Sequence, residues 1–110
     1  MIDTHCQLLH RGLAERVGDV VAEARTAGVR GLVTIGTTSD DSVRGAELAA
    51  RFDDVWCTAG IHPLHAAEPI DWEAIRRVGA LPKCVAWGEL GLDNHYPDPP
   101  RDLQRAVLEE

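Results

Sequence analysis

The sequence lacks three features that would each point to a class of protein. No apolar run approaches the roughly 18 residues of a membrane-spanning helix, and the residues after Met1 do not form a basic segment followed by an apolar one. The three cysteines are odd in number and have no paired spacing, which disfavours a disulfide framework. We therefore expect a cytoplasmic protein that does not enter membranes.

Positive charge is also scarce. Eighteen acidic residues outnumber eleven basic ones, so the formal net charge is −7. No overall positive field attracts a polyanion, and local cations would have to hold a nucleic-acid substrate. P-loop, G-x-S-x-G and C-x-x-C motifs are absent as well, so three common types of catalytic site are not indicated.

The sequence does contain four short apolar runs at similar intervals. Each is rich in Val, Ile, Thr, Trp or Cys, and Gly or Pro residues separate it from its neighbours. These runs predict strands over residues 1–9, 31–36, 55–61 and 84–90.

Helical patterns alternate with the apolar runs. Apolar residues recur at helical spacing over 13–27, and Gly28 follows at the position of a left-handed C-cap. N-cap oxygens at 38–41 begin a second pattern, and shorter ones follow. The predicted helices cover 13–27, 39–52 and 71–79, and a fourth begins after Pro100.

This βα order predicts a single α/β domain with a parallel sheet. Units of roughly 25 to 30 residues fit both an open doubly wound sheet and a (β/α)8 TIM barrel. A flavodoxin-like sheet is disfavoured, because residues 8–12 do not form the glycine-rich phosphate loop expected after its first strand.

The first predicted strand carries possible metal ligands. Active sites of parallel sheets lie at the C-terminal ends of the strands, and Asp3, His5 and Gln7 alternate so that they are predicted to share one face. Gln7 offers an amide oxygen, which binds transition metals more weakly than an imidazole. Taken alone, His5 is also compatible with a hydrogen-bonded structural histidine.

Two other strand exits carry polar side chains. Glu89 directly follows an apolar strand, so it is a candidate metal ligand or general base, or else a solvated loop carboxylate. Pro63 favours an extended backbone at His62, which is a candidate for binding an anionic substrate. Asp93 is compatible with orienting a ligand or with forming an Asx turn.

Three ordered segments carry a family resemblance. Residues 2–6 (IDTHC), 60–63 (GIHP) and 88–93 (GELGLD), followed by Gln104, resemble the N-terminal half of the TatD-type metal-dependent deoxyribonucleases. The similarity covers essentially the whole chain, including the intervals between the segments. It implies a TIM-barrel hydrolase that cleaves phosphodiester bonds with two divalent metals, which would be Mg, Mn or Zn.

The resemblance also assigns roles to individual residues. It implies that His5 is a metal ligand and that Glu89 is a catalytic carboxylate shared by both metals. Gln7 would be a weak ligand in place of the family's histidine. His62 would contact the substrate phosphate, and Asp93 would be a supporting residue.

The resemblance further implies that residues 1–110 are a partial TIM-barrel hydrolase domain. It would comprise strands one to four and the start of helix four, truncated at the C-terminus, with a weakened metal site and doubtful activity by itself. The expected partners are DNA or another phosphodiester substrate, and a second copy that associates through unpaired sheet edges. The alternative from another class is a non-catalytic α/β module that binds a partner or an anionic small molecule.

Overall fold

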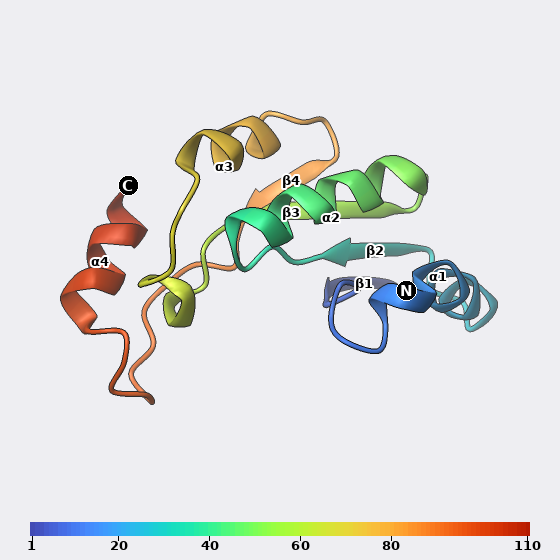
Figure 1. Ribbon diagram of the computed structural model, residues 1–110. Helices are drawn as coiled ribbons and strands as arrows, with labels where there is room; N and C mark the ends of the chain where they lie inside the picture. Colours follow the sequence, from blue (N-terminus) through green and yellow to red (C-terminus); the bar gives the residue numbers. More distant parts are fainter.

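The computed structural model describes residues 1–110 as an alternation of strands and helices (Figure 1). Two short 3-10 helices, Ala14–Arg16 and Pro63–His65, precede α1 and follow β3. None of the helices has the length and apolar character needed to span a membrane. The bounds are β1 Ile2–Cys6, α1 Val17–Thr26, β2 Gly31–Thr34, α2 Ser39–Arg51, β3 Val55–Ala59, α3 Trp72–Gly79, β4 Cys84–Trp87 and α4 Arg101–Glu109.

The four strands form one parallel sheet in the order β1-β2-β3-β4. Figure 1 shows α2 and α3 along the same side of this sheet, whereas α1 and α4 lie towards opposite ends of the molecule. The predicted α/β class and parallel sheet are confirmed. Because strand order follows chain order, β1 and β4 are both edge strands without a partner.

The helix ends follow the local chemistry that the sequence indicated. The Thr38 hydroxyl accepts the Asp41 amide at 3.1 Å and caps α2, and the Asp71 carboxylate accepts the Ala74 amide at 2.9 Å and caps α3. Gly28 has a φ of +91°, a conformation that glycine adopts without a Cβ clash, and it ends the turn after α1.

The strands are shorter than the apolar runs that predicted them. Ile35 and Ile61 lie beyond the ends of β2 and β3 but remain 8% and 6% exposed. Apolar character reports burial, whereas a strand also requires ladder pairing, so the runs overstate the strand lengths. The first helical pattern is likewise divided between the 3-10 turn Ala14–Arg16 and α1.

The core lies between the sheet and the helices. It includes Val21 of α1, Leu48 of α2, Val55 and Cys57 of β3, and Ile75 of α3, each at most 5% exposed. Burial raises the pKa of the Cys57 thiol to about 11, with the neighbouring Cys84 thiol as a second cause. All three cysteines are free, and Cys57 is a small packed residue of the core.

Candidate metal centre

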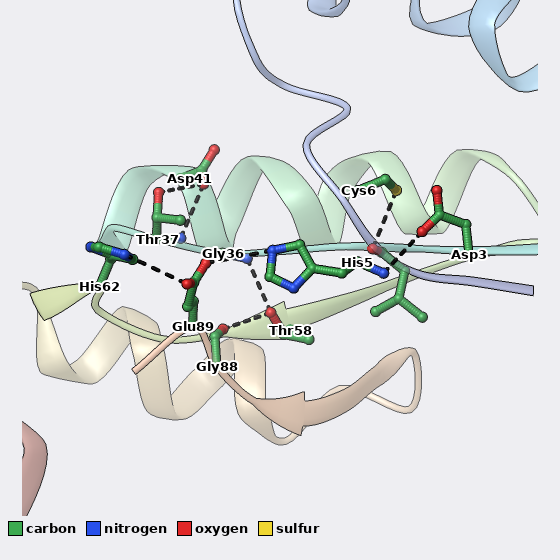
Figure 2. A network of polar contacts seen from close by, with 11 residues as sticks. Asp3, His5, Cys6, Gly36, Thr37, Asp41, Thr58, His62, Gly88 and Glu89 are labelled. Carbon is green, nitrogen blue, oxygen red and sulfur yellow. Dashed lines mark hydrogen bonds and ion pairs between the residues drawn. The ribbon is translucent and has the colours of Figure 1, made fainter. Parts of the chain in front are cut away.

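Three side chains meet where the strands end. His5 lies near the end of β1, His62 follows β3, and Glu89 follows β4. His5 Nε2 is 3.6 Å from Glu89 Oε2, and His62 Nε2 is 3.5 Å from Glu89 Oε1. Figure 2 shows the Glu89 carboxylate between the two rings, and we call these three residues the mouth cluster. The expected approach of His5 and Glu89 at one edge of the sheet is thus found.

Backbone contacts between neighbouring strand ends hold Glu89. Its amide donates to the Gly36 carbonyl at 2.7 Å, and the amide of Gly88 donates to the Ala59 carbonyl at 2.9 Å. The Thr58 hydroxyl donates to the Gly88 carbonyl at 2.6 Å. These bonds fix the backbone of Glu89, whose side chain remains 36% exposed.

The orientation of His62 is set by its own turn. Its backbone is extended, with φ −62° and ψ 140°, as Pro63 favours. Its Nδ1 accepts the Leu64 amide at 3.1 Å, so in the neutral ring the proton lies on Nε2, the nitrogen that faces Glu89. His62 therefore presents an N–H donor to the mouth cluster.

His5 is held less tightly. Its side chain is 58% exposed, and its backbone amide donates to the Asp3 carboxylate at 3.0 Å. Burial and the nearby Asp3 charge raise the pKa of the Cys6 thiol to about 11, and this thiol donates to the Val33 carbonyl. The Cys6 thiol thus points to the backbone of β2 rather than to Glu89.

Gln7 lies outside the strand that was predicted to present it. β1 ends at Cys6 and its register with β2 shifts between Asp3 and Cys6, so the expected alternation does not continue through residue 7. The Gln7 carbonyl accepts the His10 amide in a turn, and its side chain forms no hydrogen bond. The prediction of a strand over residues 1–9 is therefore wrong at its end, because this turn replaces the ladder.

Asp93 takes part in a loop rather than in the mouth cluster. Its carboxylate accepts the amides of His95 and Tyr96 at 3.1 and 2.8 Å, which is the Asx-turn alternative. Its own amide donates to the side chain of Gln104, which is 2% exposed and also donates to the Pro99 carbonyl. Asp93 and Gln104 together order the segment between Glu89 and α4.

The mouth cluster has the donor chemistry of part of a metal site. A cation bound tetrahedrally at about 2.0–2.2 Å places two ligand atoms roughly 3.4 Å apart, and the His5 and Glu89 atoms are 3.6 Å apart. Imidazole and carboxylate suit zinc and manganese. No group of three or more His, Cys, Asp or Glu side chains in the chain is arranged to hold a metal ion, so any set here is incomplete.

Comparison with known proteins identifies the family. The model of the family described as "TatD related DNase" matches residues 2–110. The chain belongs to this family. It is 37% identical over 109 residues to the 3'-5' ssDNA/RNA exonuclease TatD of Salmonella typhimurium, and 34% identical over 99 residues to the metal-dependent hydrolase YcfH of Escherichia coli.

A solved structure shows the same fold. The crystal structure of YjjV, a TatD homologue from Escherichia coli, superposes with a TM-score of 0.85 at 28% identity. The match covers 99% of this chain and 44% of YjjV, and the fold is that of the N-terminal half of a TIM barrel. The chain covers 42% of the Salmonella TatD relative and 37% of YcfH.

Sequence reasoning did not identify Thr58, which joins the Gly36 amide to the Gly88 carbonyl. A threonine in a strand is unremarkable, because β-branched residues favour strands. A usable signal was the run Thr58-Ala59-Gly60, where a hydroxyl directly precedes the two small residues at the strand exit.

Proposed function

We propose that residues 1–110 are the N-terminal part of a TatD-like hydrolase that cleaves phosphodiester bonds, with His5 and Glu89 as ligands of a divalent metal. The observation that carries this proposal is the 3.6 Å approach of His5 Nε2 to Glu89 Oε2 from the two edge strands. The names of the relatives, an ssDNA/RNA exonuclease and a metal-dependent hydrolase, support the reaction class.

Each residue of the mouth cluster has its own role in the proposed reaction. When bound, the metal would polarise the phosphoryl oxygen and lower the pKa of the attacking water. Both Glu89 oxygens face an imidazole, so the carboxylate can serve two positions. His62 contributes its Nε2–H to an anionic oxygen of the substrate, which the net charge of −7 would otherwise repel.

Gln7 and Asp93 have less direct roles in the proposed function. The amide oxygen of Gln7 is a poor replacement for imidazole, so the first metal position is weakened. Asp93 supports the loop after Glu89 through its bonds to the His95 and Tyr96 amides. A cytoplasmic location is part of the proposal and agrees with three free cysteines.

A second copy of the chain is the proposed partner. The side chains of Ile2 on β1 and Val85 on β4 are 61% and 54% exposed on the two edge strands. A rotation of 180° about the barrel axis would place β1 of one copy beside β4 of the other with parallel directions. Four strands from each copy would make eight, the number at which side chains just fill the interior of a barrel.

Metal titration tests the proposed function. Calorimetry with Mn²⁺ should show binding to the wild-type chain and a large loss in Glu89→Gln, which removes the charge and keeps the shape. Glu68→Gln is the matched control, because Glu68 also pairs with a histidine, His65, but forms no ion pair with His5 or His62. Equal Mn²⁺ affinities of the wild type and Glu89→Gln would show that Glu89 is not a metal ligand.

The non-catalytic alternative rests on a different observation. The chain contains no complete set of three metal-ligating side chains. If the wild type binds neither Mn²⁺ nor Zn²⁺ and does not cleave labelled single-stranded DNA, a module that binds a partner or an anionic small molecule is favoured.

A further inference from the structure

We propose that Thr58 is a positioning residue of the candidate metal centre, because its buried hydroxyl holds the Gly88 carbonyl and thereby aims the carboxylate of Glu89. The inference rests on the proposed function of Glu89 as a metal ligand, and it adds a residue of β3 that forms no hydrogen bond with His5 or His62.

Thr58 belongs to a closed set of hydrogen bonds across three strand exits (Figure 2). Its hydroxyl donates to the Gly88 carbonyl at 2.6 Å and accepts the Gly36 amide at 3.0 Å. The carbonyl of Gly36 in turn accepts the Glu89 amide at 2.7 Å. The carbonyl and the amide of the peptide between Gly88 and Glu89 are thus both hydrogen-bonded, and Thr58 supplies the only side chain in the set.

The Thr58 hydroxyl lies in a closely packed part of the structure. Thr58 is 4% exposed. A Cβ at Gly60 would lie 2.5 Å from the Gly88 carbonyl carbon, and a Cβ at Gly36 would lie 2.4 Å from the Ser42 hydroxyl. In Thr58→Val a methyl group would take the place of the hydroxyl, and the Gly36 amide, which donates to that hydroxyl, would be left without a partner.

The position of Gly88 matters because Glu89 is the next residue. The two carboxylate oxygens of Glu89 lie 3.5–3.6 Å from the nitrogens of His62 and His5. A ligand distance is defined to within tenths of an ångström, so a carboxylate whose backbone can move would be a poorer ligand. Loss of a residue that orients a metal ligand lowers affinity roughly 10- to 100-fold.

Three variants separate positioning from general stability. Thr58→Val removes the hydroxyl and keeps the shape, whereas Thr58→Ser keeps the hydroxyl. Thr34→Val is the matched control, because Thr34 is 2% exposed on the neighbouring β2 and forms no hydrogen bond with Gly88. Thr58→Val should bind Mn²⁺ about 10- to 100-fold more weakly than the wild type, while Thr58→Ser and Thr34→Val should stay within a few-fold.

A second measurement needs no metal. The ring NMR signals of His5 and His62 at one fixed pH report the adjacent carboxylate, and Glu89→Gln sets the size of the change when that carboxylate is lost. Thr58→Val should move both rings in the direction of Glu89→Gln. Thr34→Val should leave them at their wild-type positions.

The outcomes distinguish this inference from the proposed function. If the wild type binds Mn²⁺ and Thr58→Val binds equally well, the positioning role is overturned and the metal role of Glu89 stands. If the wild type does not bind Mn²⁺, the metal role of Glu89 fails, and the ring signals alone decide whether Thr58 positions Glu89. Unchanged ring signals in Thr58→Val then overturn the positioning role. If Thr58→Val does not fold, Thr58→Ser decides the question. In this variant the Gly36 amide should stay protected from hydrogen exchange, and the ring signals of His5 and His62 should stay at their wild-type positions. Loss of the protection or a shift of the ring signals overturns the inference.

Discussion

A methyl group at Gly60 is the most direct perturbation of the contact between β3 and the segment that carries Glu89. The added carbon would lie 2.5 Å from the carbonyl carbon of Gly88 and 2.8 Å from the nitrogen of Glu89. An ordinary contact begins at 3.4 Å, so the backbones must separate by roughly 0.9 Å. The Gly88 amide is 2.9 Å from the Ala59 carbonyl, and such a separation breaks this bond.

Gly60→Ala should therefore affect both stability and the candidate metal centre. We expect the free energy of unfolding to fall by about 1–3 kcal/mol, the usual effect of overpacking. Mn²⁺ affinity should fall as well, because Glu89 moves with Gly88. Urea denaturation followed by tryptophan fluorescence measures the first effect, and calorimetry measures the second.

Gly18→Ala is the control for this prediction. Gly18 lies in α1, and a Cβ there would meet no atom within 4 Å. The same chemical change should raise the free energy of unfolding by roughly 0.5–1 kcal/mol, because alanine favours the helix. If Gly60→Ala is as stable as the wild type and binds Mn²⁺ equally, the close approach at Gly60 does not position Glu89.

Three further predictions use other parts of the molecule. Gln7→His should strengthen Mn²⁺ or Zn²⁺ binding in calorimetry, and equal affinities would mean that residue 7 does not face a metal. Arg25 donates two hydrogen bonds to Asp54, which hold the Asp54 pKa below its usual value. The stabilisation is therefore present above pH about 4 and is lost as the pH falls through the folded pKa. The melting temperature of Asp54→Asn should lie below that of the wild type at neutral pH, with the difference closing in acid; a constant difference would contradict this. Sedimentation at micromolar concentration should show a dimer that Val85→Lys weakens, and a compact 12 kDa monomer that unfolds cooperatively would rule out association through the edges.

Local chemistry was the part of the fold that could be predicted. The Thr38 cap and the left-handed Gly28 each depend on a few adjacent residues, and each occurs as expected. Strand ends depend on pairing with a distant segment. β1 therefore ends two residues before Leu8, which is nevertheless 2% exposed and packs in the core.

The candidate site was likewise predicted only in part. The resemblance singled out His5, His62 and Glu89, and the parallel order of the strands explains why residues so far apart in sequence meet at one edge. The alternation predicted for the first strand does not extend to Gln7, because β1 ends at Cys6 after a register shift.

The contacts that hold Glu89 were beyond the reach of pattern reasoning for a physical reason. Thr58 and Gly88 are 30 residues apart, and the bond between them exists because glycines at 36 and 60 let three backbones approach closely. Nothing in the periodicity of β3 separates a threonine with a distant partner from one that merely favours a strand. Such a contact depends on the spacing of whole strands. Gly60 directly follows β3 and closely approaches Gly88 and Glu89, so a single methyl group there should displace the backbone that carries the Glu89 carboxylate.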